Sequence, residues 1–294
     1  MRVALATCTA LPEGHEDDRL LLAPLAERGA EARFEAWDDP AADWEGYDRV
    51  VVRSTWDYTS RREEFVGWAV RVGERIRNRP EVIRWNSDKA YLAELAGEGI
   101  AVVPTRFVRP GDPLPELAGE VVVKPAISAG ARDTGRFGPG AHAQARELLA
   151  RLQGAGRTAM VQPYLERVDA AGETAIAFIS GRASHVLRKQ AVLQPDEEAP
   201  VREEDGLGAA LAMWDEELVA AGEASEGERE LAATVIAALE RRFGEAPLYA
   251  RVDMLRDEGG IPHLVELEAV EPGLYLATAP GAAERLADAI LAAD

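Results

Sequence analysis

The stretches LYARVDML (248–255) and HLVELEAVEPGL (263–274) place acidic side chains inside two apolar, strand-like runs. Side chains two residues apart on a strand share a face, so Glu266 and Glu268 project together. If the strand that carries Asp253 pairs beside them, three negative groups meet, at a Coulombic cost that a bound cation removes. An all-oxygen set of this kind suits Mg2+ shared with a phosphate. The pattern predicts a magnesium site of Asp253, Glu266 and Glu268, the alternative being a solvent-facing sheet.

A second feature is EVVVKPAISAGARDTGRFG (120–138), where a β-branched run ends in Lys124 and is followed by small residues and glycines. Backbone N–H groups of a glycine-bearing loop can approach phosphate oxygens closely, and a lysine adds positive charge. The segment is neither a Walker A sequence nor a GxGxxG fingerprint. It predicts a strand that delivers Lys124 into a phosphate-holding loop.

Lys89 lies in a segment, 87–99, that is expected to form a helix, after a strand-like run EVIRWN (81–86). A lysine in the first turn has the wrong sign for the positive end of a helix, unless an anion lies beside both. We therefore interpret Lys89 as a phosphate contact. The alternative is an exposed lysine without a role.

Taken in chain order, Lys89, Lys124, MVQPYLE (160–166) and the three acids resemble the ATP-grasp superfamily, over about residues 85–280. Within it, the chain is most similar to the cyclo-ligases that make cycloserine from O-ureidoserine and to their uncharacterised relatives. The motifs that carry this narrower resemblance are RSTWDY (53–58), WNSDK (85–89), KPAISAGARDT (124–134), SHVLRK (184–189) and ELEAVEP (266–272).

The resemblance implies an α/β fold with α+β lobes, namely the ATP-grasp fold preceded by a Rossmann-like pre-ATP-grasp domain. Strand-like runs at 2–8, 31–37 and 47–54 alternate with helical patterns such as 17–30, which favours a parallel, doubly wound sheet in that first domain. The expected units are a substrate-side domain (1–104), a small lobe with a glycine lid loop (105–165) and a large lobe with the metal site (166–294).

The resemblance also implies ATP and Mg2+ as cofactors, with adenine between the lobes against the segment that follows a strand at 158–164. Pro163 lacks an N–H, so donors must come from neighbours such as Leu165. Either Glu166 or Asp169 would hold the ribose hydroxyls. The residues expected to contact ATP are Lys89, Lys124, Ser128, Ala129, Gly130, Gln162, Tyr164, Leu165, Glu166 and Asp169.

Cationic side chains are expected beside the transferring phosphoryl group. Arg251 shares a strand face with Asp253, because only one residue separates them. Arg188 and Lys189 are adjacent, so only one of them faces the cleft. The resemblance implies that cations at these positions stabilise the phosphorylated intermediate.

The substrate is expected at RSTWDY, where a strand of the first domain ends, since doubly wound sheets bind ligands beyond the C-terminal ends of their strands. Asp57 is the predicted ammonium contact, and Ser54 or Thr55 would add a hydrogen bond. The alternative is that Trp56 and Tyr58 only pack, and that Asp57 or Ser54 caps the next helix.

The predicted function is that of an ATP- and Mg-dependent ligase, which forms a C–N bond through a phosphorylated intermediate on a small amino-acid-like substrate. Ring closure within one substrate and ligation of two amino acids or peptides both remain open. A kinase of the same fold and a non-catalytic ATP-binding protein are further alternatives. Three acids argue against the latter, because binding adenine alone does not require them.

Composition restricts the partners and the compartment. The net charge of −19 argues against nucleic acid, and no run of eighteen apolar residues predicts a membrane span. The single cysteine, Cys8, excludes an internal disulfide and fits a reducing, cytoplasmic location. Residues 194–230 are strongly acidic, and Arg202 is the substrate contact retained there. ATP and the substrate are the expected partners, and the superfamily makes a homodimer an expectation too.

Overall fold

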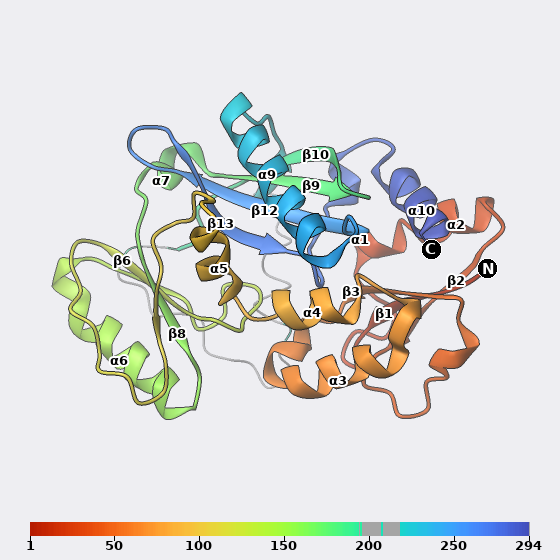
Figure 1. Cartoon of the computed structure of the whole chain (residues 1–294), viewed down its shortest axis with the longest axis horizontal. Helices are drawn as coiled ribbons and strands as arrows, with labels where there is room; N and C mark the ends of the chain where they lie inside the picture. Colours follow the sequence, from red (N-terminus) through yellow and green to blue (C-terminus); the bar gives the residue numbers. More distant parts are fainter. Residues whose placement is uncertain (194, 196–206, 208–217, 294) are drawn as a thin grey trace.

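The computed structural model describes residues 1–193, 195, 207 and 218–293. These residues form three sheets (Figure 1). One sheet falls within each of the ranges 1–104, 105–165 and 166–294. None of the helices in this part of the chain is long and apolar enough to cross a membrane.

The first sheet is parallel with the order β2-β1-β3-β4, as the alternation of strands and helices predicted. The helix expected over 17–30 is divided into two short helices. Pro24 cannot donate a backbone hydrogen bond, so it fits only in the first turn of a new helix. The elements are β1 (Arg2–Thr7), α1 (Glu16–Arg19), α2 (Leu22–Glu27), β2 (Glu31–Ala36), β3 (Arg49–Ser54), α3 (Arg62–Val72) and β4 (Ile76–Arg77).

Residues 81–86, which were expected to form a strand, belong to helix α4 (Pro80–Asn86), and α5 (Tyr91–Gly97) follows it. Pro80 starts the helix at a position where its missing N–H costs nothing, and a short apolar run alone does not distinguish strand from helix. Lys89 therefore lies in a turn between two helices and not in the first turn of one. The prediction that Lys89 lies in the first turn of a helix, next to the positive end of the helix dipole, was therefore wrong.

The central sheet is antiparallel with the order β11-β10-β9-β12-β13, and α9 packs across it (Figure 1). Along β12, Ala250, Val252 and Met254 enter the core, which leaves Arg251 and Asp253 on the opposite face. Helices α4 and α5 belong to this same core, although they precede residue 104. The elements are α7 (Arg167–Ala171), β9 (Glu173–Ile179), β10 (Arg182–Lys189), β11 (Val219–Ala221), α9 (Glu226–Phe243), β12 (Tyr249–Arg256), β13 (Pro262–Glu268) and α10 (Ala282–Ala292).

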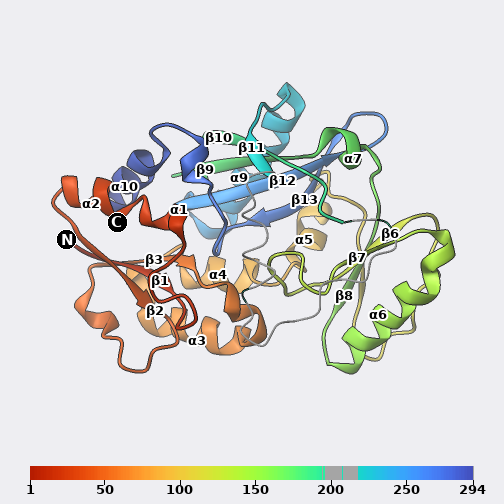
Figure 2. The ribbon, with the colours of Figure 1, turned by 180° about the vertical axis from the view of Figure 1, so that it is seen from behind.

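The third sheet is antiparallel with the order β5-β8-β6-β7, and helix α6 covers one face with Leu148, Leu149 and Leu152. Its position at one end of the molecule is visible in both ribbon views (Figures 1 and 2). The elements are β5 (Arg106–Val108), β6 (Val121–Pro125), β7 (Gly135–Phe137), α6 (His142–Gly154) and β8 (Ala159–Pro163).

The outer edge of β13 is closed by side chains of the two helices before it. Asn86 donates to the carbonyl of Leu267 (2.8 Å) and accepts from the N–H of Ala269 (2.6 Å). The hydroxyl of Tyr91 contacts both the carbonyl and the N–H of Leu267, each at 2.8 Å. The segment 101–103 continues the pairing along the same edge. This fixes the strand that carries Glu266 and Glu268.

Candidate active site

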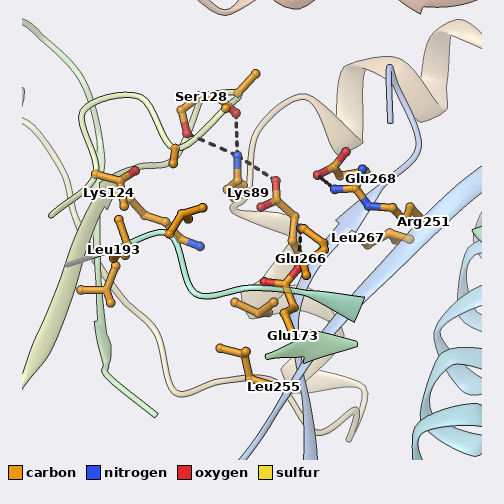
Figure 3. A pocket seen from close by; sticks show the side chains of 18 of the residues that line it. Lys89, Lys124, Ser128, Glu173, Leu193, Arg251, Leu255, Glu266, Leu267 and Glu268 are labelled. Atoms are coloured by element: carbon orange, nitrogen blue, oxygen red, sulfur yellow. Dashed lines mark hydrogen bonds and ion pairs between the residues drawn. The ribbon is translucent and has the colours of Figure 1, made fainter. Parts of the chain in front are cut away.

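A cavity lies between the three sheets, and residues from all three parts of the chain line it (Figure 3). Trp56 and Tyr58 belong to the first part, where a short 3-10 helix (Trp56–Ser60) follows β3. The sequence contains only three lysines, Lys89, Lys124 and Lys189, and all of them line this cavity. Every other cationic side chain among the 33 lysines and arginines is an arginine. The sequence analysis named all three lysines as candidate site residues, but it did not use the scarcity of lysine in the rest of the chain as a signal.

Strands β12 and β13 carry alternating charges on the face opposite the core. Their register places Arg251 opposite Glu268 and Asp253 opposite Glu266, so the predicted pairing of the two runs is confirmed. Arg251 donates from Nε to Asp253 Oδ1 (2.8 Å) and from Nη2 to Asp253 Oδ2 (2.7 Å), and it also donates to Glu268. Lys189 Nζ adds a bond to Asp253 Oδ2 (2.9 Å). The protein itself therefore offsets much of the repulsion among the acids.

Lys89 and Lys124 face this array from the other side of the cavity. Lys89 Nζ lies 3.0 Å from Glu266 Oε1 and donates to the carbonyl of Ser128 at 2.8 Å (Figure 3). Lys124 forms no ion pair with any described residue, and burial lowers the pKa of its ammonium group. Burial also raises the pKa of Glu266, but the two lysines outweigh it and lower the pKa. The 128–130 segment lines the cavity beside both lysines.

The two acids that contact Arg251 have opposite pKa shifts. For Glu268, burial and the charges of Asp253 and Glu266 outweigh Arg251 and raise the pKa to about 7. For Asp253, the cations Arg251 and Lys189 outweigh burial and hold the pKa well below its usual range. Asp253 is thus an ionised partner of two cations, whereas Glu268 is only about half ionised near pH 7.

Among the described residues, no three His, Cys, Asp or Glu side chains gather into a group that could hold a metal ion. The predicted set of three carboxylates is therefore not assembled in this structure, because both oxygens of Asp253 are engaged by Arg251 and Lys189. Glu266 and Glu268 do line the cavity. Their donor chemistry fits Mg2+, which binds proteins through one or two carboxylates plus substrate phosphates.

The segment after β8 forms another wall of the cavity. Its lining residues include three of those predicted to contact the nucleotide, Gln162, Tyr164 and Leu165. Glu166 and Asp169, the two alternatives for the ribose, do not line it. Asp169 instead accepts from Arg136 (3.0 Å) and from the hydroxyl of Tyr164, and its side chain is 45% exposed. Glu166 is the N-cap residue of α7, and Asp169 lies in its first turn.

Comparison with known proteins decides the family. A family model of the N-terminal domain of the D-cycloserine synthetase DcsG matches residues 3–78. The cycloserine biosynthesis protein DcsG of Streptomyces lavendulae is 35% identical over 268 residues, which cover 86% of each chain. The chain belongs to the DcsG family of ATP-grasp ligases.

Solved structures agree with this assignment to the DcsG family. The crystal structure of D-cycloserine synthetase DcsG matches with a TM-score of 0.86 and 32% identity, over 99% of this chain and 98% of that chain. D-alanine–D-alanine ligase of Bacillus anthracis complexed with ATP shares the fold, with a TM-score of 0.67 and 14% identity over 99% and 96% of the two chains. A RimK domain ATP-grasp protein of Sphaerobacter thermophilus has a TM-score of 0.64 and 18% identity over 99% and 100%. The predicted ATP-grasp fold is confirmed.

The polar residues of RSTWDY do not line the cavity of this DcsG-family chain. Asp57, the predicted ammonium contact, accepts from Trp37 Nε1 (2.9 Å) and from Arg61. Ser54 donates to a buried acid of α1, and Thr55 is fully buried. The 3-10 helix after β3 instead directs the two aromatic residues of the motif, Trp56 and Tyr58, to the cavity. The polar side chains named by the prediction therefore do not line the cavity, although the motif contributes two other residues to its wall.

Arg188 and Lys189 are the last two residues of β10, and they point to opposite faces of the sheet, as adjacent residues on a strand do. Lys189 lines the cavity and contacts Asp253, whereas Arg188 donates to Thr174 and to the carbonyl of Glu223 (2.9 Å). Arg188 is therefore not part of the cavity wall. The predicted substrate contact Arg202 lies outside the described residues.

Two acids of the cavity wall were missed, Glu173 and Glu271. Glu173 lies opposite Lys189 in the β9–β10 register and accepts from its ammonium group. An acid at the first position of an apolar strand was the available signal. Glu271 lies within the ELEAVEP motif, three residues after Glu268.

The 126–138 loop was expected to close as a lid, with Arg132 and Arg136 open to proteases in the free protein. Both arginines are buried in the structure, at 3% and 7% exposure. Arg132 donates to Thr59 of the first part (3.3 Å), and Arg136 belongs to β7 and pairs with Glu120. The expected cleavage sites are therefore contradicted by these contacts.

Proposed function

We propose that this ligase uses ATP and Mg2+ to phosphorylate the carboxylate of a small amino-acid-like substrate, and that a nitrogen of the same molecule then closes a ring. A carboxylate oxygen attacks the terminal phosphorus and ADP leaves. The nitrogen attacks the carbonyl carbon, and phosphate leaves with the carboxylate oxygen. The charge array of β12 and β13, which shares one cavity with all three lysines of the chain, carries this proposal. The 35% identity to a cycloserine biosynthesis protein supports ring closure.

Glu266 and Glu268 are the residues that would hold Mg2+, since both line the cavity. When bound, the ion neutralises phosphate oxygens and orients them. Asp253 would act differently from the first expectation. It holds Arg251 and Lys189 in place through three hydrogen bonds of 2.7–2.9 Å, and its burial keeps those cations close to the reacting groups.

The lysines would bind the phosphates. Lys124 forms no ion pair with an acid among the described residues. It can therefore contact a phosphate without first breaking an ion pair. Lys89 must exchange the carbonyl of Ser128 for a phosphate oxygen. Arg251 would stabilise the negative charge that develops during transfer, because a fixed cation in a site shielded from water costs no reorganisation.

The test is an assay of ADP release with O-ureido-D-serine alone, beside a panel of paired amino acids, combined with mass spectrometry of the products. Release with the single substrate supports ring closure if the product mass is that of the substrate less one water, or that of cycloserine once water has removed the carbamoyl group from the ring nitrogen. Release only with a pair, and a condensed product, would assign a two-substrate ligase. A phosphorylated product that does not react further indicates a kinase. Nucleotide binding without ADP release indicates a non-catalytic protein.

A further inference from the structure

In the turn that follows β13, five consecutive backbone carbonyl groups, those of residues 270–274, each accept a hydrogen bond from a side chain. The donors come from β3, the 3-10 helix after it, β10 and β12. A turn fixed from so many directions presents its own side chains at defined positions. The bonds are Tyr249 Oη to Val270 O (3.0 Å), Trp56 Nε1 to Glu271 O (3.2 Å), Arg53 Nη2 to Pro272 O (2.9 Å), Arg251 Nη1 to Gly273 O (2.7 Å) and His185 Nε2 to Leu274 O (2.7 Å).

Glu271 is the acidic residue of this turn, and its side chain lines the cavity. Its carboxylate accepts a hydrogen bond from its own backbone N–H and forms no ion pair with any described residue, unlike Glu266 and Glu268, which contact Lys89 and Arg251. Burial and the negative charge of Glu268 raise the pKa of Glu271 to about 8. The charge of Lys89 lowers this pKa but does not outweigh burial and Glu268, so the ionised carboxylate is left without a paired cation.

The surroundings indicate what kind of cation is missing. No group of three acids that includes Glu271 could hold a metal ion among the described residues. The neighbours of Glu271 along the cavity wall are Trp56 and Tyr58, both nearly buried. The indole of Trp56 bonds to the carbonyl of Glu271, and Glu271 is the side chain whose charge most raises the pKa of Tyr58 after burial itself. Aromatic rings beside a carboxylate suit an organic ammonium group.

We propose that Glu271 binds the ammonium group of the substrate, with Trp56 and Tyr58 beside it. This assignment rests on the proposed function, and it replaces Asp57, whose carboxylate is occupied by Trp37 and Arg61. An α-amino acid carries its ammonium group one carbon away from the carboxylate that reacts. Glu271 follows Glu268 by three residues and so lies next to the reacting end of the cavity.

Binding is measured by calorimetry in the presence of magnesium and a non-hydrolysable ATP analogue, which separates recognition from turnover. The ligands are O-ureido-D-serine and the analogue with hydrogen in place of the amino group. Glu271→Gln is compared with the wild type and with Glu63→Gln, a control whose side chain is 82% exposed on α3. Charge-assisted hydrogen bonds predict a loss of roughly 10- to 100-fold for the amino compound in Glu271→Gln.

The expected pattern is that the des-amino compound binds equally to the wild type and to Glu271→Gln, and that affinity for the ATP analogue changes less than about twofold. Wild-type protein that binds both compounds equally, or neither, overturns the assignment. A Glu271→Gln variant that loses affinity for magnesium or nucleotide also overturns it, because Glu271 would then serve the metal. If the binding pattern holds but no ADP is released, only the proposed function fails.

Discussion

Asp253 and Glu268 both contact Arg251, yet their environments stabilise different protonation states. Asp253 is paired with two cations at 1% exposure, and its pKa is lowered. Glu268 has a pKa raised to about 7, so its ionised form is destabilised in the folded protein. The same chemical substitution at the two positions should therefore change stability in opposite directions.

We expect Asp253→Asn to lower the free energy of unfolding by about 2–4 kcal/mol, because it removes the carboxylate that two buried cations share. Glu268→Gln should raise it at pH 8, by no more than about 3 kcal/mol, which is the limit that the raised pKa allows. The folded pKa of Glu268 exceeds the unfolded value of 4.5, so its destabilising effect appears as the pH rises toward 7 and is absent near pH 4.5. Urea titrations at pH 8 and pH 5 measure both effects. A gain for Glu268→Gln that persists at pH 5 contradicts this interpretation.

At the scale of elements, the position of Glu266 and Glu268 depends on how the outer edge of β13 is closed. Tyr91 satisfies the carbonyl and the N–H of Leu267 with one hydroxyl group. An edge strand that has its polar groups paired cannot slip in register. The helix that carries Tyr91 therefore holds the acids in their places without touching a ligand.

Tyr91→Phe should lower the free energy of unfolding by about 1–3 kcal/mol, because two buried backbone groups lose their partner. The rate of ADP release should fall as well, since β13 is less well held. Tyr47→Phe is the control, because its hydroxyl contacts the side chains Arg33 and Glu35 rather than backbone groups. Chemical denaturation and the ADP assay measure the two effects, and equal losses in both variants would argue against a role of the strand edge.

Helix α9 starts with Ser225 as its cap and with Glu228 reaching back to it. Burial raises the pKa of Glu228, but hydrogen bonds from Arg256, Thr174 and Ser225 outweigh it and hold the pKa at about 2. Because this value lies below the unfolded pKa of 4.5, the stabilisation is complete above pH 4.5 and is lost as the pH falls toward 2. It amounts to no more than about 3 kcal/mol.

Glu228→Gln should therefore be clearly less stable than the wild type at pH 7, and the difference should shrink at pH 3. Glu226→Gln, in the first turn of the same helix but exposed, is the matched control and should differ little at either pH. Thermal unfolding followed by circular dichroism gives both comparisons. A difference for Glu228→Gln that is the same at both pH values rules out the titration of this carboxyl as its cause.

The elements show why sequence reasoning succeeded in one place and failed in another. The acids of 263–274 stood out because strand periodicity separates them from the apolar residues, and the pairing with β12 followed. The segment EVIRWN was predicted as a strand, but it forms a helix. Six residues are too few to distinguish the strand period from the helix period, and the prediction did not consider that Pro80 favours the start of a helix. Asp57 was favoured over Trp56 because polarity was taken as the sign of a site. Which side chain faces the cavity depends on partners such as Trp37, which are distant in sequence.

At the scale of the whole molecule, shared hydrophobic cores join the three sheets. The core beneath the first sheet joins Leu25 of α2 and Val3 of β1 with Leu286 and Ile290 of α10. Figure 2 shows that this brings the two ends of the chain together at one side. The small lobe lies at the opposite end, and the cavity separates it from the large lobe. Occupation of the cavity should therefore stabilise the assembly of lobes.

Addition of ATP and magnesium should raise the melting temperature, by an amount equivalent to about 2.7 kcal/mol at one hundred times the dissociation constant. Chelation of the metal with EDTA should remove most of the shift, because Glu266 and Glu268 then face the phosphates without a cation between them. Differential scanning fluorimetry over a series of ATP concentrations, with and without EDTA, measures the shift in melting temperature. An undiminished shift in EDTA would mean that the lysines alone hold the nucleotide.

The restriction of lysine to the cavity has a chemical consequence. Arginine supplies all other side-chain cations, so the primary amines of this protein are its amino terminus and Lys89, Lys124 and Lys189. An acylating reagent that modifies amines can therefore react at side chains only in the cavity. The amine of the chain terminus, which lies outside the cavity, serves as an internal reference. We expect ATP with magnesium to suppress modification of the three lysines while the terminus reacts as before, as intact-protein mass spectrometry can show. Equal labelling with and without nucleotide would place the phosphates elsewhere.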